Sequence, residues 1–263
     1  MKMDLNEIQD YWQKQAAKHG QNPAASWSDV NAINLEISEM SKWLRDGAQV
    51  VDIGCANGFS TLQYAAQFAI NIKGVDYVPE MIAAANKHLG AMEGRLKGTA
   101  RFDVGDISNL SEADGEYDIA IVTRVIINLG DRKRQIAGIR EAARVVKSGG
   151  LLLLSEATRE GWNRLNALRS EWGLEAIPEP SFNLYIDEEL ARSAAPDLLD
   201  LVKISNFSSS YSVATRVIKP LLAQALKNGV DPARPDMEWN RFASFLPAVG
   251  DYGTQKLFVF QRR

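Results

Sequence analysis

An acidic residue and two glycines in the segment VVDIGCANGFS have the spacing of a ligand-binding turn. Asp52 ends a short apolar run, and Gly54 and Gly58 follow before a segment of helical character. Glycines in such a turn let backbone N–H groups approach a ligand closely. About twenty residues further on, Asp76 ends the next apolar run, where a carboxylate can accept hydrogen bonds from ribose hydroxyls. Together, the two signals predict a site for an adenine nucleoside or a dinucleotide.

The form of this turn distinguishes between the two ligands. Dinucleotide-binding turns usually read G-x-G-x-x-G, whereas this one reads D-x-G-x-x-x-G with Ala56 between the glycines. Asp52 would repel a pyrophosphate, but it suits a ligand that has no phosphate and carries sulfonium and ammonium groups. S-adenosylmethionine (SAM) has these groups, so we favour it over a nicotinamide dinucleotide. By residue type alone, Asp76 could instead cap a helix that begins near Pro79, and the glycines could serve only a tight turn.

These residues require a sheet that brings the ends of several strands together. From about residue 48, short β-branched or Leu-rich runs alternate with amphipathic segments, as in a parallel sheet covered by helices on both faces. Short turns join these units, which predicts a doubly wound α/β fold with a seven-stranded, Rossmann-like sheet. The expected strands are 48–53, 70–76, 100–105, 117–123, 149–156, 201–207 and 255–261.

Five segments in this order resemble the motifs of the class I SAM-dependent methyltransferase family. They are VVDIGCANG, GVDYVPEMI, FDVGDI, YDIAIVTRV and RVVKSGGLLLLSE, which lie within residues 48–156. The chain departs from the commonest first motif because it has Ala56 for the middle glycine and Asn57 before the last one. The resemblance implies a methyltransferase sheet, SAM as the cofactor and S-adenosylhomocysteine (SAH) as its product.

The resemblance also implies which residues hold the cofactor. Asp52 would hold its ammonium end, and Asp76 would hold the ribose. By residue type, Asp106 could serve only as a helix cap, whereas the resemblance implies a role at the adenine. The further residues implied are Gly54, Cys55 and Gly58 around the methionine moiety, Tyr77 and Met81 around the adenine, Asp106 and the Ile107 N–H at the adenine edge, and Thr123 and Arg124 beside the sulfonium.

Methyl transfer is an in-line displacement, so an enzyme has to align the nucleophile and exclude water. A general base is needed only for a poor nucleophile such as an alcohol. Glu156 ends the fifth expected strand and Arg124 follows the fourth, so we expect both at the catalytic end of the sheet. Glu156 would act as a general base or acceptor ligand, or else as a helix cap or a partner of Arg159. The candidates for acceptor binding are Tyr11, Asn128, Asn166, Arg169, Asn183, Tyr185, Tyr211 and Arg216.

The segments around the core predict a lid and a cap on a single domain. We expect residues 1–46 to form a helical N-terminal lid, 47–156 the SAM-binding core, 157–198 a cap insertion, and 199–263 the rest of the sheet with a helical insertion. This arrangement is similar to small-molecule methyltransferases of sugar or surface-polysaccharide pathways. Arginines in the cap favour a hydroxylated or anionic acceptor, although each could equally lie on a solvated helix face.

Composition excludes several classes of partner. The net charge of −3 argues against a protein whose main partner is the nucleic-acid backbone. The single cysteine, the lack of an export signal and the lack of a long apolar run predict a cytoplasmic protein with no membrane partner. The two histidines and one cysteine show no metal-ligand spacing, so we expect no metal site.

The sequence therefore predicts a SAM-dependent methyltransferase that acts on an oxygen of a small polar metabolite, such as a sugar or an anionic polysaccharide precursor. It would work as a monomer or a homodimer. The alternatives are an N-methyltransferase on a small metabolite, a SAM-binding module without activity, and a nicotinamide-dependent oxidoreductase, which Asp52 disfavours.

Overall fold

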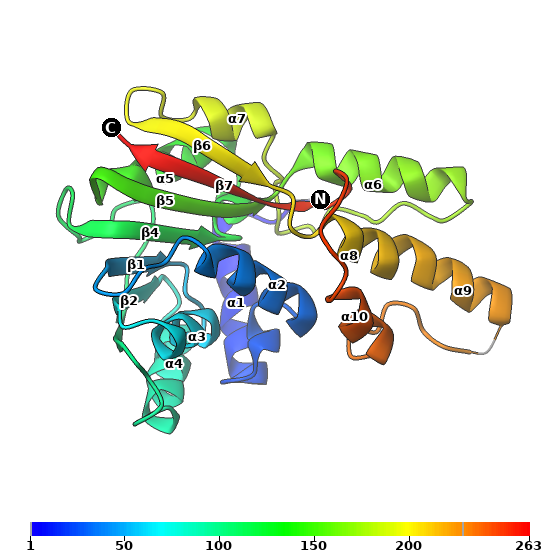
Figure 1. The fold of residues 1–263 in the computed structure, drawn as a ribbon, viewed down its shortest axis with the longest axis horizontal. Helices are drawn as coiled ribbons and strands as arrows, with labels where there is room; N and C mark the ends of the chain where they lie inside the picture. Colours follow the sequence, from blue (N-terminus) through cyan, green and yellow to red (C-terminus); the bar gives the residue numbers. More distant parts are fainter. Residues whose placement is uncertain (1, 228) are drawn as a thin grey trace.

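The computed structural model describes residues 2–227 and 229–263. Its sheet contains β1 (Gln49–Ile53), β2 (Asn71–Asp76), β3 (Thr99–Val104), β4 (Tyr117–Thr123), β5 (Val146–Ala157), β6 (Leu199–Ser205) and β7 (Gln255–Arg262). The spatial order of these strands is β3-β2-β1-β4-β5-β7-β6. Strands β1 to β5 run parallel, whereas β7 runs antiparallel to its neighbours β5 and β6 (Figure 1). The predicted doubly wound, seven-stranded α/β sheet is confirmed.

Both faces of the sheet are buried, because successive side chains of a strand point to opposite faces. In β1, Val50 packs in the core cluster that includes α2 and α3, whereas the next residue, Val51, packs in the cluster that includes α5 and α7. Ile121 and Val122 of β4 divide between the same two clusters. The covering helices are α2 (Val30–Ser41), α3 (Phe59–Gln67), α4 (Pro79–Ala91), α5 (Arg132–Arg144) and α7 (Glu188–Ser193).

The N-terminal segment forms helix α1 (Leu5–His19), a short 3₁₀ turn η1 (Pro23–Ala25) and helix α2. Helix α1 begins at a capping box, in which Asp4 and Glu7 each accept a hydrogen bond from the backbone N–H of the other. In Figure 1, α1 and α2 lie beside the carboxyl end of β4. The segment expected to act as a lid therefore reaches the edge where a ligand would bind.

The cap segments form α6 (Arg159–Glu171), α8 (Ser209–Val213), the π-helical turn η3 (Ala214–Ile218), α9 (Lys219–Leu226) and α10 (Glu238–Ala243). Helices α6 and α9 extend together away from the sheet (Figure 1). Leu165 of α6 and Val217 of η3 belong to one buried apolar cluster, which holds the two arms together. None of the helices in the described part of the chain has the length and apolar character needed to cross a membrane.

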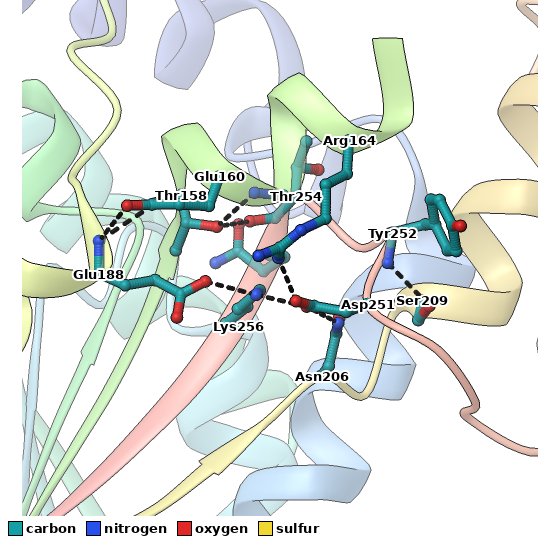
Figure 2. A network of polar contacts seen from close by, with 12 residues as sticks. Thr158, Glu160, Arg164, Glu188, Asn206, Ser209, Asp251, Tyr252, Thr254 and Lys256 are labelled. Atoms are coloured by element: carbon teal, nitrogen blue, oxygen red, sulfur yellow. Dashed lines mark hydrogen bonds and ion pairs between the residues drawn. The ribbon is translucent and has the colours of Figure 1, made fainter. Parts of the chain in front are cut away.

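A buried lysine fastens the cap to the sheet. Lys256 of β7 is almost fully buried and pairs with Glu188, at 2.6 Å, and with Asp251 (Figure 2). Asp251 also accepts hydrogen bonds from Arg164 of α6 and from Asn206, which follows β6. Because an isolated buried charge is strongly unfavourable, these partners fix α6, α7 and the end of β6 against β7.

Candidate active site

A cavity of about 440 Å³ opens at the carboxyl ends of β1, β2 and β4. This is the edge at which open α/β sheets bind ligands. Except for Gly58, every residue predicted to contact the cofactor lines this cavity, and helix α1 contributes a further wall. The predicted cofactor residues in the wall are Asp52, Gly54, Cys55, Asp76, Tyr77, Met81, Asp106, Ile107 and Thr123.

The turn after β1 needs its glycines for two different reasons. Gly54 has φ +76°, and a Cβ atom there would lie 2.1 Å from Cγ2 of Val125. Gly58 has φ +72° at the start of α3, and a Cβ atom there would lie 2.7 Å from the ring of Phe102. Gly54 thus leaves room for Val125 in the loop after β4, whereas Gly58 leaves room for Phe102 of β3 beside the start of α3.

Asp76 links the ends of β1 and β2. Its carboxylate accepts hydrogen bonds from the backbone N–H groups of Ala56, at 2.9 Å, and Val78, at 3.0 Å. Val78, not Asp76, occupies the N-cap position of α4. Burial raises the pKa of Asp76 to about 6, so the ionised carboxylate gains from any further donor that the cavity supplies.

Asp52 is a second buried carboxylate on the same cavity. It accepts a hydrogen bond of 2.5 Å from the Thr61 hydroxyl of α3. Burial raises the pKa of Asp52 to about 6, and the negative charges of Asp76 and Glu36 add to the shift. A cationic group in the cavity would offset this repulsion. The ammonium and sulfonium of SAM, together with its ribose hydroxyls, therefore fit the donor and acceptor groups that the cavity presents.

The expected adenine end is built from the loop after β3. Asp106 accepts a hydrogen bond of 2.8 Å from the Ser108 N–H and pairs with Asn109 in an isolated bridge. No described helix begins there, so the alternative that Asp106 caps a helix is wrong. Met81 is buried and Tyr77 is half-buried, and both line the cavity from the side of α4.

Arg124 follows β4 and lines the cavity in an unusual backbone conformation, with φ +56°. Its guanidinium pairs with Glu36 of α2 and lies 5.2 Å from the ring centre of Trp27. Glu36 is buried and also accepts hydrogen bonds from Ser155, at 2.5 Å, and from Gln255, at 3.0 Å. Arg124 is thus neutralised by the lid helix and holds that helix against the strand ends.

Glu156 does not occupy the position expected of a general base. It is 0% exposed and lies outside the cavity wall. One carboxylate oxygen accepts the backbone N–H groups of Val125, at 2.8 Å, and Ile126, at 2.7 Å, so Glu156 caps the 3₁₀ turn η2 (Ile126–Asn128). Burial raises the pKa of Glu156 to about 8. The prediction of a catalytic carboxylate here is therefore corrected to a structural cap.

Of the predicted acceptor residues, Asn128 lines the cavity. Its side-chain amide donates a 2.8 Å hydrogen bond to the Arg124 carbonyl. Tyr11 does not line the cavity and stacks on Phe182, with ring centres 4.5 Å apart. Asn183 and Tyr185 follow Phe182 in the cap loop and do not line the cavity. The structure therefore retains Asn128 as an acceptor candidate and gives these three residues no place in the wall.

The other predicted acceptor residues make structural contacts within the cap. The Asn166 side-chain amide bonds both to the carbonyl and to the N–H of Ile177, and Arg169 donates to the Glu175 carbonyl. Tyr211 and Arg216 both donate to Asp29, which caps α2. None of these four residues lines the cavity, so their role as substrate ligands stays a prediction that the cavity does not support.

Sequence reasoning predicted a helical lid, but it did not name the α1 residues that line the cavity. Leu5, Ile8 and Trp12 line the cavity from one side of this otherwise polar helix. Their i, i+3, i+7 spacing was a readable signal of a buried helix face. Glu36 was also missed, although a charged residue within the apolar stripe of Ile33 and Met40 indicates a buried ion pair.

Comparison with known proteins finds a similarity to methyltransferases in the region that builds this cavity. Residues 50–150 match a family model described as a methyltransferase domain. The ajmaline N-methyltransferase of Rauvolfia serpentina is 33% identical over 112 residues, which cover 42% of this chain and 37% of that protein. The demethylmenaquinone methyltransferase of Corynebacterium kroppenstedtii is 28% identical over 168 residues, covering 61% of this chain and 66% of that one.

The fold extends this similarity over the whole chain. The magnesium protoporphyrin IX methyltransferase of Synechocystis PCC 6803, solved with bound SAH, superposes with a TM-score of 0.63 and 16% identity, over 99% of this chain and 100% of that one. At this identity the likeness shows the fold alone. The chain spans less than half the length of the first curated relatives that it matches. Residues 50–150 therefore resemble a methyltransferase domain, and the chain as a whole has the fold of that solved methyltransferase.

Proposed function

We propose that the protein transfers a methyl group from SAM to a small molecule. One observation carries this proposal: two buried carboxylates, Asp52 and Asp76, face a single cavity behind the turn that starts at Gly54. A ligand with cationic groups and ribose hydroxyls satisfies both carboxylates, whereas a pyrophosphate would be repelled by Asp52.

Each wall residue then has a definite task toward the cofactor. When bound, SAM supplies an electrophilic methyl group on its sulfonium. Asp52 holds the ammonium end beside the backbone of Gly54 and Cys55, and Asp76 accepts the ribose hydroxyls. Arg124 and Thr123 lie at the end of β4, beside the expected position of the sulfonium. The adenine is held by Tyr77, Met81, Asp106 and the Ile107 N–H.

The cavity offers little help to a poor nucleophile. Its described wall contains no histidine, lysine or glutamate, and Glu156 is bonded to the backbone outside it. Burial raises the pKa of the Cys55 thiol and of the Tyr77 hydroxyl, so neither group ionises readily. The wall carboxylates are assigned to the cofactor. Catalysis would then rest on alignment and on exclusion of water rather than on proton abstraction.

We therefore favour an acceptor that is nucleophilic without a protein base, and we favour an amine nitrogen first. The relatives named as ajmaline and phosphoethanolamine N-methyltransferases are consistent with this choice. An electron-rich ring carbon is the second candidate, supported by the similarity to a demethylmenaquinone methyltransferase. A sugar hydroxyl loses support, because an alcohol needs a base and the cap arginines have internal partners.

The test measures cofactor binding and turnover separately. Calorimetry should show binding of SAM and SAH but not of NAD; binding of NAD alone would overturn the proposal. SAH formation is then followed with small amines, hydroquinones and free sugars, each at several pH values. We expect turnover with amines, and the rate should rise with pH according to the pKa of the amine used. Turnover with sugars alone would refute the acceptor class, and SAM binding without turnover on any class would favour a module without activity.

A further inference from the structure

Helix α1 forms one wall of the cofactor cavity. Leu5, Ile8 and Trp12 form its inner surface over the cavity. Trp12 and Ala16 also pack against Met81 and Ala56, which belong to the cofactor wall. A movement of α1 would widen the cavity on this side, so the contacts at the two ends of the helix determine how readily this wall opens.

One end of α1 is fastened by Asn57, which stands inside the cofactor-binding turn. The Asn57 side-chain amide donates two hydrogen bonds of 2.8 Å, one to the carbonyl of Gly20 and one to that of Asn22. Gly20 is the C-cap of α1, and Asn22 is the N-cap of η1. Asn57 is 1% exposed, so both bonds are shielded from water.

The turn that carries Asn57 is fixed on both sides of this residue. The Cys55 N–H donates to the Val75 carbonyl, and the Gly58 N–H donates to the Cys55 carbonyl, both at 3.0 Å. The side chain of Asn57 is therefore presented to the lid from a fixed position, between Ala56, which bonds to Asp76, and Gly58, which starts α3. Any shift of the cofactor turn moves the two bonds to α1 directly.

The opposite end of α1 is attached to the cap loop through contacts that are more exposed to water. The Met3 N–H donates a 3.1 Å hydrogen bond to the Ser181 carbonyl, and Lys2 pairs with Glu179 at 2.9 Å. The Lys2 side chain is 48% exposed, so water competes for its contacts. Tyr11 adds its stacking on Phe182. This end contacts the cap loop and not the turn that holds the methionine end of the cofactor.

We propose that Asn57 is a positioning residue that latches α1 over the cofactor, so that cofactor exchange requires its two hydrogen bonds to break together. The inference rests on the proposed function, because it takes SAM or SAH as the ligand of the cavity. The Asn57 latch connects the turn that holds the methionine end of the cofactor to the helix that covers it. A bound cofactor that steadies the turn thereby also keeps the lid closed.

The test compares Asn57→Ala and Asn57→Ser with the wild type in stopped-flow binding of SAH, followed through tryptophan fluorescence because Trp12 lines the cavity. Loss of two buried hydrogen bonds should raise both the association and the dissociation rate constants, the latter about tenfold in Asn57→Ala. The serine hydroxyl can keep one of the bonds, so Asn57→Ser should fall between the wild type and Asn57→Ala. Asn34→Asp, at an exposed position of α2, is the matched control and should leave both rates unchanged.

The two rates distinguish a latch from general support of the turn. If Asn57 only shaped the cofactor site, its loss would speed dissociation without speeding association, and that result would overturn the latch. Unchanged rates in both variants would also overturn it. If wild-type protein binds neither SAM nor SAH, the proposed function fails first. If Asn57→Ala is recovered unfolded, the same comparison is made with Asn57→Ser, for which both rates must still rise.

Discussion

The cofactor cavity and the cap use the same kinds of polar side chain in opposite ways. At the cavity, Asp52 and Asp76 are buried with few partners and keep their capacity for a ligand. In the cap, Tyr211 and Arg216 converge on Asp29, and Lys256 is enclosed by two carboxylates. A polar residue type therefore does not by itself mark a binding site. The group must also face a cavity and keep hydrogen-bonding capacity, whereas the cap groups are bonded to one another.

The largest expected effect concerns the cap alone. Lys256→Ala leaves Glu188 and Asp251 without their buried cation and should lower the free energy of unfolding by about 3 kcal/mol. Urea denaturation measures this loss. Arg234→Ala, which breaks an exposed pair, is the control and should change stability by less than about 0.5 kcal/mol. A tenfold loss of SAH affinity in a folded Lys256→Ala protein would show that the cap contacts also determine cofactor binding, contrary to the comparison drawn above.

The next effect concerns the cavity alone. Asp76→Ala removes the acceptor for the ribose hydroxyls and for the Ala56 and Val78 N–H groups, so SAM affinity should fall by about 100-fold. Calorimetry measures the affinity. Asp200→Ala, on the far edge of the sheet at β6, should bind SAM like the wild type. Wild-type affinity in Asp76→Ala would show that the ribose is held elsewhere.

Cofactor affinity should also depend on pH in the range set by the two carboxylates. Their pKa values lie at about 6 in the protein without cofactor, and the cofactor favours the ionised forms. Affinity should therefore be constant above pH 7 and fall as the pH drops through 6, by up to about tenfold per pH unit for each group. Titrations between pH 5 and 8 test this, with Asp52→Asn expected to flatten the curve. A pH-independent affinity would mean that neither carboxylate contacts the cofactor.

The smallest effect sharpens the assignment of Glu156. Glu156→Gln keeps an oxygen that can accept the Val125 and Ile126 N–H groups, so turnover should stay within about twofold of the wild type. Burial raises the pKa of Glu156 to about 8, whereas the same carboxyl group ionises near its ordinary pKa in the unfolded chain. The free energy of unfolding should therefore fall as the pH rises from 5 to 8. The glutamine variant should lose less stability over that range in urea titrations. A collapse of turnover with intact SAM binding would restore Glu156 as a catalytic base.

The sheet and the cofactor wall could be predicted from the sequence because both depend on residues that are close neighbours in the chain. Val50 and Val51 belong to a short apolar run, and Asp52 and Gly54 follow it directly, so neighbouring residues reveal the turn. Asp76 ends the next strand along the chain, and parallel strands bring such ends to one edge of the sheet.

The roles of the predicted acceptor residues could not be read from the sequence, because their hydrogen-bond partners lie far away along the chain. Tyr211 bonds to Asp29, 182 positions away, and Arg169 reaches the carbonyl of Arg216, 47 positions away. Residue type gives no indication that such a partner exists. Glu156 was misplaced for a related reason: its strand and register were predicted, but the amide groups that claim its carboxylate belong to the turn after β4.

The contacts of Glu36 bear on the order in which parts of the chain can fold during synthesis. Its carboxylate is completed by Arg124, Ser155 and finally Gln255, which lies 219 positions later. Until β7 inserts between β5 and β6, Gln255 cannot donate to Glu36, and water has to hydrate this carboxylate in its place. We therefore expect the lid helix to dock fully only after the last strand has been synthesised.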